Sequence, residues 1–517
     1  MATRQQQELT EPLPQLSPLS LLNPLKLDRE SCYAILCSHD ARFDGRLFIG
    51  VKTTGIYCRP VCRVRTPRAE NCIFFSSAAA AEAQGFRPCL KCRPELAPGE
   101  APVDAPARTA RRAALIIEED EQAANNIAHL AQVLQISERQ FRRVFADAYG
   151  VSPVRYLQTR KLLLAKNLLT DTTLPITDIA FTARFKSVRR FNELFKKHYR
   201  LAPRDFRRGS GTAQSADPQE SVTVLLAYRP PYQWQTLLDF LAGRVIDGVE
   251  SVQGKCYRRT VRMTEEKDVT HTGWVQVSHL PKKHALSVTV ASSLLPVLAK
   301  VLARVRHLFD LNANPAVIDR SLDLMNHHKP GSYVPGTRVP GCFDAFEMTV
   351  RAILGQQVTV KAAQTLARRV VQTFGAPITT PFDDLYCLFP SAQTIARLSQ
   401  PIADHLGPLG ITGARARCIG TLAQGIQKGD LQLNLTADPL LQMEKLLALP
   451  GFGPWTVNYV ALRALGWPDA FPHTDYGIKK ALEPLNAKQI LKLSEAWKPW
   501  RAYATINLWN SLNQEKA

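Results

Sequence analysis

Two close pairs of cysteines constrain the N-terminal part of this chain more than any other feature does. Three residues separate Cys58 from Cys62, and two separate Cys89 from Cys92, which follow after a gap of 26 residues. Two close thiol pairs at such a distance are typical of a tetrahedral zinc site with four sulfur ligands. The chain is therefore predicted to hold one Zn²⁺ ion through these four cysteines. The spacing alone leaves open whether the site is only structural or also reactive.

Two stretches of linker-like composition divide the 517 residues. Residues 94–107 are rich in proline, alanine and acidic side chains, and residues 209–220 are small and polar. Between them the hydrophobic periodicity is helical. After them the chain begins with strand-like alternation at 222–228 and becomes almost wholly helical from about residue 296. This division predicts several domains of different class, as expected for this length.

The formal charge of +20 comes from basic side chains spread along the chain. It favours a polyanion such as nucleic acid as a partner, although a soluble basic protein without such a partner has the same composition. The sequence contains no run of eighteen or more apolar residues, so we expect no transmembrane helix. The first 25 residues lack the pattern of a secretory signal. We expect no membrane partner and a cytoplasmic location.

The sequence around the cysteines resembles the Ada-type methylphosphotriester repair domain. The resemblance covers about residues 30–94 and rests on residues 43–60 and 85–94. It implies that Cys58 is both a zinc ligand and the nucleophile that takes a methyl group from a DNA phosphotriester. Zinc keeps such a sulfur as the reactive thiolate, and the transfer is stoichiometric because a thioether is a poor leaving group. The candidates for holding the flanking phosphates are Arg59, Arg63, Arg65 and Arg68.

Two helix-turn-helix patterns follow, about 50 residues apart. In the first, Ser137 is the predicted N-cap of a second helix that ends at Gly150. Its predicted buried face consists of Phe141, Val144, Phe145 and Ala148. Its opposite face is basic and polar, which fits the reading of a DNA major groove. The predicted DNA-binding residues on that face include Arg139 and Arg143.

The second pattern runs from residues 175–181 through a turn to a helix that starts at Ser187. Its predicted DNA-binding residues are Arg189, Arg190 and Asn192. Two solvated helices are the alternative for either pattern alone, but two in tandem resemble an AraC-type regulator domain. Members of that family usually have glycine before the phenylalanine of the second turn, where this chain has Arg184. If the position requires a positive φ, an arginine there costs free energy.

From residue 221 to its end the chain resembles the AlkA-type 3-methyladenine DNA glycosylase II. The matching strings are Pro340-Gly-Cys-Phe-Asp-Ala-Phe-Glu, Arg351-Ala-Ile-Leu-Gly-Gln, Leu449-Pro-Gly-Phe-Gly-Pro-Trp-Thr, Asp475-Tyr-Gly-Ile-Lys and Trp497-Lys-Pro-Trp-Arg. Gly451 and Gly453 fall in the turn of a predicted helix–hairpin–helix, where the backbone can approach a phosphate closely. Gln357 matches the family's gap-filling position, where the best-known members have leucine.

Asp475 is expected to begin a helix, and an N-cap is the simplest interpretation of an aspartate there. The resemblance instead makes Asp475 the catalytic carboxylate, which stabilises an oxocarbenium-like state during glycosidic cleavage. It also places Trp455, Tyr459 and Trp509 in the base pocket, although each alone is more often a core residue. Lyase-competent relatives carry a lysine just after the hairpin. This chain has Trp455 there, which predicts a monofunctional glycosylase.

Together these features predict a multidomain α+β protein that repairs alkylated DNA and activates transcription. The predicted domains are a four-cysteine zinc domain (28–94), an all-α double helix-turn-helix domain (108–208), a small antiparallel β-sheet/α domain (221–310) and an all-α helix–hairpin–helix glycosylase domain (311–517). The expected partners are alkylated double-stranded DNA, a promoter operator and RNA polymerase. The alternative is a DNA-binding regulator whose glycosylase-like region is an inactive clamp.

Overall fold

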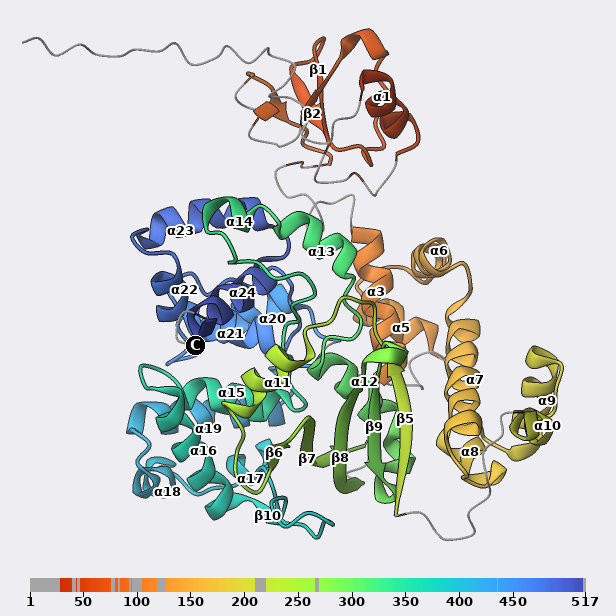
Figure 1. The fold of residues 1–517 in the computed structure, drawn as a ribbon, viewed down its shortest axis with the longest axis vertical. Coiled ribbons are helices and arrows are strands. Elements are labelled where there is room, and N and C mark those ends of the chain that lie inside the picture. The colour runs from red at the N-terminus through yellow and green to blue at the C-terminus, as the bar shows by residue number, and fades with distance from the viewer. Residues whose placement is uncertain are drawn as a thin grey trace, which may run out of the picture. The chain divides into compact units, whose positions relative to one another are not determined.

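The computed structural model describes residues 28–39, 43, 47–75, 80–81, 84–92, 94, 105–119, 126–209, 220–265, 269–434 and 436–514. The chain divides into two compact units, Met1–Thr109 and Ala110–Ala517 (Figure 1). The predicted multidomain α+β class is confirmed. The first predicted linker overlaps the beginning of helix α3 (Ala105–Glu119), and residues 210–219 of the second lie outside the described residues.

A four-stranded sheet forms the centre of the first unit, with strand order β3-β1-β2-β4. Its elements are α1 (Arg29–Cys37), β1 (Phe48–Val51), β2 (Ile56–Cys58), η2 (Ala69–Asn71), β3 (Cys72–Phe75) and β4 (Arg87–Pro88). β1 pairs antiparallel with both β2 and β3, whereas β4 lies parallel to β2. Ile49, Tyr57 and Phe75 are fully buried, but they belong to small separate clusters. Hydrophobic cores this small contribute little stability, so the unit depends on stabilising interactions other than apolar packing.

The second unit begins with a run of helices that contains both predicted helix-turn-helix motifs. After α3 these helices are α5 (Ile127–Val133), α6 (Glu138–Tyr149), α7 (Pro153–Asp171), α8 (Ile176–Thr182), α9 (Val188–Tyr199) and α10 (Pro203–Gly209). Ser137 and Ser187 are the N-caps of α6 and α9, as predicted, and each hydroxyl accepts a backbone N–H three residues on, at 3.2 Å. The prediction that Ala148 is buried was wrong: Ala148 lies in the last turn of α6, just before the helix ends, and is exposed.

The turns of the two motifs share one unusual backbone conformation. Gln135 in the first turn and Arg184 in the second have φ values of 56° and 58°. The position of Arg184 therefore does require a left-handed residue, which explains why the family usually has glycine there. The second motif nevertheless forms with arginine at this point.

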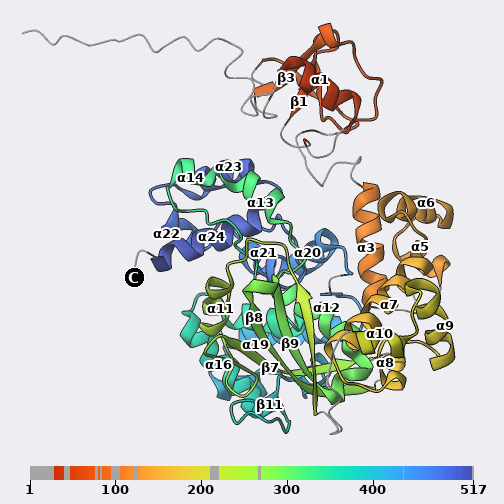
Figure 2. The same ribbon diagram turned by 45° about the vertical axis from the view of Figure 1, so that its right-hand side comes forward.

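A five-stranded antiparallel sheet follows, with strand order β5-β9-β8-β7-β6 (Figure 2). Its elements and covering helices are β5 (Ser221–Ala227), α11 (Trp234–Ala242), β6 (Glu250–Gln253), β7 (Cys256–Thr264), β8 (Thr270–Leu280), η5 (Pro281–Lys283), β9 (Ala285–Ala291), η6 (Ser292–Val297) and α12 (Leu298–Leu308). β5 confirms the strand predicted at 222–228. Its valines alternate inward, and Val224 lies opposite Val288 in the register with β9.

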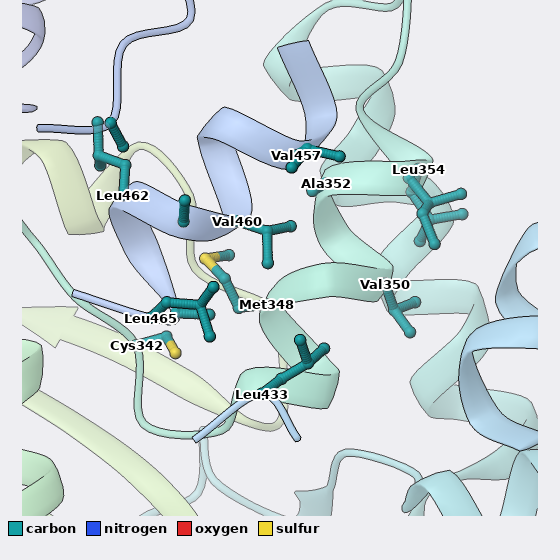
Figure 3. Packing of buried hydrophobic residues seen from close by; sticks show 14 of the residues in the cluster. Cys342, Met348, Val350, Ala352, Leu354, Leu433, Val457, Val460, Leu462 and Leu465 are labelled. Atoms are coloured by element: carbon teal, nitrogen blue, oxygen red, sulfur yellow. The ribbon is translucent and has the colours of Figure 1, made fainter. Parts of the chain in front are cut away.

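The rest of the chain is almost entirely helical, as predicted. Its elements are α13 (Pro315–Leu322), α14 (Met325–His328), α15 (Ala345–Leu354), α16 (Val360–Phe374), β10 (Ala376–Pro377), β11 (Cys387–Leu388), α17 (Ala392–Ala396), α18 (Ala403–Leu406), η7 (Gly407–Leu409), α19 (Gly413–Gln427), α20 (Pro439–Leu447), α21 (Pro454–Arg463), α22 (Tyr476–Ala481), α23 (Ala487–Ser494), η8 (Glu495–Trp497) and α24 (Arg501–Gln514). Val457 and Val460 of α21 pack toward Met348 and Ala352 of α15 (Figure 3). Among the described residues no helix is both long and apolar enough to cross a membrane.

Three buried charged residues, Glu250, Arg259 and Glu347, and the partly buried Arg351 join the sheet to α15. Arg259 contacts Glu347 at 2.7 Å and Glu250 at 3.4 Å, and Arg351 contacts the same two carboxylates at 3.0 and 2.8 Å. Burial alone would raise the pKa of Glu250, but Arg351 and Arg259 outweigh it and hold that pKa at about 2. The charges cancel within the cluster, so each member depends on the others for compensation.

Replacing Glu347 with alanine should leave a buried guanidinium without its counter-charge. We expect the free energy of unfolding to fall by about 3–5 kcal/mol, because an uncompensated buried charge is strongly destabilising. Chemical denaturation followed by tryptophan fluorescence measures the change. Glu193→Ala is the matched control, since Glu193 pairs with Arg189 at 3.0 Å on the exposed surface and should cost less than about 1 kcal/mol. Equal losses in the two variants would contradict the assigned role of the cluster.

Candidate active site and metal centre

The four predicted metal-binding cysteines meet in one buried cluster of the first unit. The sulfur atoms of Cys58, Cys62, Cys89 and Cys92 all lie within 4.8 Å of one another. Zn–S bonds of about 2.3 Å in a tetrahedron place the sulfurs roughly 3.8 Å apart, so the cluster fits a zinc ion. Each residue supplies one thiol, the donor that zinc prefers in closed sites.

Strand pairing brings the two cysteine pairs together. Cys58 is the last residue of β2, and Cys89 follows β4, which lies parallel to β2. The backbone N–H of Cys89 donates to the carbonyl of Tyr57 at 3.0 Å. The second cysteine of the first pair returns through a tight turn, in which Cys62 N–H donates to Arg59 O at 3.1 Å.

Arg59 does not hold a phosphate, which corrects one expectation from the sequence. Its side chain is fully buried, and its guanidinium donates to the carbonyl of Cys92 at 3.4 Å. This hydrogen bond therefore stabilises the position of the second cysteine pair. The three other candidates for phosphate contact are exposed: Arg63, Arg65 and Arg68.

Hydrogen bonding with Cys62 and Cys92, followed by burial, raises the pKa of the Cys58 thiol far above its usual range. A bound Zn²⁺ ion supplies the positive charge that keeps the four sulfurs deprotonated at neutral pH. All four cysteines are buried.

A large cleft of about 1070 Å³ opens in the second unit between α11 and the helices of the C-terminal part. All four residues predicted for base release line it, although they come from two helices, α21 and α24, and from the N-cap of a third, α22. These residues are Trp455, Tyr459, Asp475 and Trp509. The tertiary structure thus brings the predicted set together at one site.

Asp475 occupies the wall of this cleft and is the N-cap of α22. Its Oδ1 accepts the backbone N–H groups of Gly477 and Ile478 at 2.8 and 3.2 Å. The indole N–H of Trp509 donates to the same oxygen at 2.8 Å, and that of Trp455 donates to Oδ2 at 2.8 Å. All four partners are donors, so the site suits a group that only accepts, which is the ionised carboxylate.

The glycine two residues after Asp475 has a steric reason. A Cβ atom on Gly477 would lie 2.9 Å from Cδ1 of Trp509 and 3.1 Å from Oδ1 of Asp475. Any side chain there would displace the indole from the carboxylate. The string Asp-Tyr-Gly is therefore one structural unit.

Aromatic rings cover the cleft beside the carboxylate. Trp455 and Tyr459, one turn apart on α21, are stacked with centroids 5.3 Å apart and planes at 15°. Tyr459 and Trp509 lie 6.1 Å apart. Phe240 of α11, which was not predicted from the sequence, stacks on Trp509 with ring centroids 6.2 Å apart. The sequence around Phe240 contains no motif that marks it as part of a site.

Two arginines contact the aromatic rings of the cleft. The guanidinium of Arg244 lies 3.7 Å from the ring centroid of Phe240, and Arg463 donates to the hydroxyl of Tyr459 at 2.9 Å. Burial by itself would raise the pKa of the Tyr459 phenol. The positive charges of Arg463 and Arg244 act in the opposite direction and hold that pKa below its usual value. The lining of the cleft therefore combines the carboxylate of Asp475 with the guanidinium groups of Arg244 and Arg351.

The predicted hairpin connects α20 and α21 next to the cleft. Gly451 has a φ of 90°, which few other residues adopt, and Gly453 is the N-cap of α21. Both glycines are exposed, while Phe452 between them is buried. No side chain caps the first turn of α21, so its backbone N–H groups are available to an anion.

Gln357 lies at the tip of the exposed segment after α15 and has a φ of 54°. The preceding residue ties this segment to the hairpin: Gln356 donates to the carbonyl of Gly451 at 2.9 Å and to the hydroxyl of Thr456 at 3.0 Å. The tip and the hairpin therefore form one surface.

The predicted recognition residues of both helix-turn-helix motifs are exposed on α6 and α9: Arg139, Arg143, Arg189, Arg190 and Asn192. The α9 face also contains Glu193, which sequence reasoning left out. It contacts Arg189 at 3.0 Å and Arg190 at 3.7 Å, so these two arginines are partly neutralised in the absence of DNA.

Comparison with known families divides the chain into four consecutive matches. Residues 31–95 match the metal binding domain of Ada, and residues 130–209 match a helix-turn-helix domain. Residues 223–344 match the AlkA N-terminal domain, and residues 350–496 match the HhH-GPD superfamily of base excision DNA repair proteins. Together with the cysteine cluster, the first match confirms zinc as the cofactor.

Individual relatives span either the whole chain or parts of it. The probable bifunctional transcriptional activator/DNA repair enzyme AlkA of Mycobacterium tuberculosis is 34% identical over 94% of this chain and 97% of its own length. DNA-3-methyladenine glycosylase 2 of Escherichia coli is 38% identical over 55% of this chain and 95% of its own length. The bifunctional transcriptional activator/DNA repair enzyme Ada of Escherichia coli is 48% identical, over 12% of this chain and 17% of its own length.

Replacing Cys89 with serine should abolish tight zinc binding and unfold the segment 30–94, because four sulfurs are needed to close the site. Metal analysis of the purified full chain should fall from one zinc per chain to near zero, and protease sensitivity should appear within that segment. Cys387→Ser is a matched control, since Cys387 is a buried cysteine of the second unit and should leave the zinc content at one. Full zinc content in Cys89→Ser would show that Cys89 is not a ligand.

Proposed function

The chain belongs to the family of bifunctional transcriptional activator/DNA repair enzymes, and from this premise we propose that it releases alkylated bases from DNA and regulates transcription in response to alkylation. The observation that carries the first activity is the carboxylate of Asp475, held by two indole N–H groups and two backbone N–H groups in an aromatic cleft. Such a carboxylate, kept ionised among apolar rings, suits a reaction that develops positive charge.

In the proposed excision the carboxylate of Asp475 stabilises an oxocarbenium-like sugar while the bond to the base breaks. Water then adds to the sugar and leaves an abasic site. An N-alkylated purine such as 3-methyladenine already carries positive charge, so it leaves with little help from a general acid. The residue after the hairpin is Trp455 rather than an amine, which supports a monofunctional hydrolase without lyase activity.

The cleft accounts for the choice of base. The substrate base must leave the duplex to reach Asp475. The faces of Trp455, Tyr459 and Trp509 then offer electron-rich surfaces on which a cationic base stacks favourably. Phe240, parallel to Trp509, is a fourth ring that we assign to the same pocket.

We assign sequence-independent DNA binding to the hairpin and to the exposed segment beside it. The backbone at Gly451 and Gly453 and the uncapped start of α21 suit a phosphate of any sequence. Gln357, which is exposed in the segment after α15, is our candidate for filling the space that a flipped base leaves. A base-independent grip is what a lesion search requires, because the lesion occurs in any sequence.

Asp475→Asn should stop base release while the protein remains folded. Asparagine is as good an N-cap as aspartate, so α22 should persist, but it carries no charge to stabilise the sugar. Release of 3-methyladenine from methylated DNA should fall on the order of 10²–10³-fold, the usual cost of losing one electrostatic group.

Asp344→Asn provides the control, since Asp344 is the N-cap of α15 and lies outside the lining of the cleft. It should keep near-normal excision. Excision by Asp475→Asn at the control's rate would assign the chemistry to another residue. Absence of excision by the unaltered protein would favour the alternative, a regulator with an inactive clamp.

The second proposed activity is transfer of a methyl group from a DNA phosphotriester to Cys58. The thiolate sulfur attacks the methyl carbon, the carbon–oxygen bond breaks, and the phosphate leaves as a diester anion. The substrate is electrically neutral, so the cluster does not repel it. Arg63, Arg65 and Arg68, all exposed, are placed to contact the flanking phosphates.

Regulation is assigned to the two helix-turn-helix motifs and to the charge of the cysteine cluster. Methylation converts Cys58 from a thiolate to a neutral thioether, which removes one negative charge. DNA phosphates are then repelled less, while the exposed residues of α6 and α9 select the promoter. An activator of this kind acts through RNA polymerase, which we propose as the protein partner.

Methylation should raise the affinity for the protein's own promoter. A unit charge at close range contributes on the order of a few kcal/mol at an effective dielectric of about 20, and about 1.4 kcal/mol is tenfold in affinity. Binding of methylated and unmethylated protein should be compared across salt concentrations. A gain that shrinks as salt increases is expected for an electrostatic origin. Equal affinities at every salt concentration would make methylation a repair end point only.

A further inference from the structure

The second helix-turn-helix motif lies against one edge of the five-stranded sheet. β5 is an edge strand, and α7 runs alongside it in both views (Figures 1 and 2). The backbone N–H of Leu225 in β5 donates to the carboxylate of Asp171 at the end of α7, at 3.3 Å. Exposed strand edges attract non-native pairing, so a covering element here has a physical purpose.

The second helix-turn-helix motif and the sheet share one hydrophobic core and do not merely contact each other at their surfaces. Leu168 of α7 and Ile179 of α8 belong to the same buried cluster as Val224 of β5 and Val297 of η6, and none of the four is exposed to solvent. The first motif differs, because Phe141 and its neighbours form a separate core of their own. Only the second motif completes its core with residues of the sheet domain.

Arg184 adds a polar link at the rim of this core. Its Nη2 donates to Glu265 Oε1 at 3.0 Å and to the carbonyl of Pro296 at 3.3 Å. Both ends of the ion pair are largely covered, with side-chain exposures of 22% and 28%. Glycine, which the backbone at this turn would favour, has no side chain to make these contacts. The contacts therefore offset the strain of an arginine with positive φ.

A second link joins the first helix of the regulator region to the glycosylase region. Arg112 of α3 donates to the carbonyl of Thr436 at 2.8 Å and lies 3.8 Å from the carboxylate of Asp438. These two residues immediately precede α20, the first helix of the hairpin motif. The helix-turn-helix region is thus attached at two separate places.

We propose that the glycosylase region carries a docking surface for the helix-turn-helix region, formed by β5, η6 and Glu265, and that Arg184 is the latch of this interface. The two regions are then one body rather than two domains on a tether. The functional consequence rests on the proposed function: the recognition helix α9 and the cleft of Asp475 then keep a fixed orientation relative to each other. The docking itself requires neither activity, so its test is independent of the proposed function.

The test cuts the covalent connection and asks whether the parts stay together. A site for a specific protease is inserted between Gly209 and Ser221 of the full chain, and the cleaved protein is passed over a size-exclusion column. The fragments should elute together at micromolar concentration. Separation of the fragments of the otherwise unaltered protein would overturn the docking proposal.

Charge reversal tests the latch within the same cleaved protein. Arg184→Glu places two carboxylates together and should raise the dissociation constant of the fragments at least about tenfold. The double variant Arg184→Glu with Glu265→Arg should restore it to within roughly threefold. Arg200→Glu is the matched control: Arg200 also has a positive φ, 63°, but is exposed at the end of α9. An effect of Arg184→Glu no larger than that of Arg200→Glu, or no restoration in the double variant, would overturn the role of Arg184.

Discussion

Four N–H groups converge on one carboxylate, that of Asp475, and much of the C-terminal architecture is organised around this contact. Two of the donors come from the first turn of its own helix, whereas the indoles come from α21 and α24. Both indoles use their N–H edge for the carboxylate, which fixes the orientation of the rings that line the cleft. The same hydrogen bonds therefore position the charge and the stacking surfaces. The packing of α21 against α15, including Val457 and Val460, holds the first indole in place.

The position of Arg244 in the cleft depends on the cluster of charged residues that includes Arg351. Arg351 belongs to the ion cluster with Glu250 and Glu347, and it also donates a hydrogen bond to the backbone carbonyl of Arg244. Arg244 in turn stacks on Phe240, which faces Trp509. The sheet domain thus contributes to the lining of the cleft through α11, and Arg351 links Arg244, which follows α11, to α15. A glycosylase of this form needs both of its regions to complete one site.

The regulator region shows how tertiary contacts offset a locally unfavourable residue. The turn before α9 requires a positive φ, and the chain supplies Arg184 instead of glycine. Its ion pair with Glu265 joins it to another region of the chain. The backbone strain at Arg184 is therefore local, whereas the contact that offsets this strain involves a residue distant in the sequence. The first motif tolerates Gln135 in the same conformation and packs around its own core. The two motifs are therefore similar in backbone but different in attachment.

The sequence by itself determined the metal centre, the two helix-turn-helix motifs and the presence of an aspartate and three aromatic rings suited to base release. Spacing of cysteines, serine caps and apolar periodicity are local patterns, and local patterns are readable along a chain. Phe240 and the ion cluster escaped notice because their partners lie far away in the sequence, as Glu250 does from Arg351. Arg59 was predicted to contact a phosphate because the sequence shows its charge. The sequence does not show that its side chain is buried. Only the tertiary structure decided that the second motif shares a core with the sheet, since burial depends on how distant segments pack.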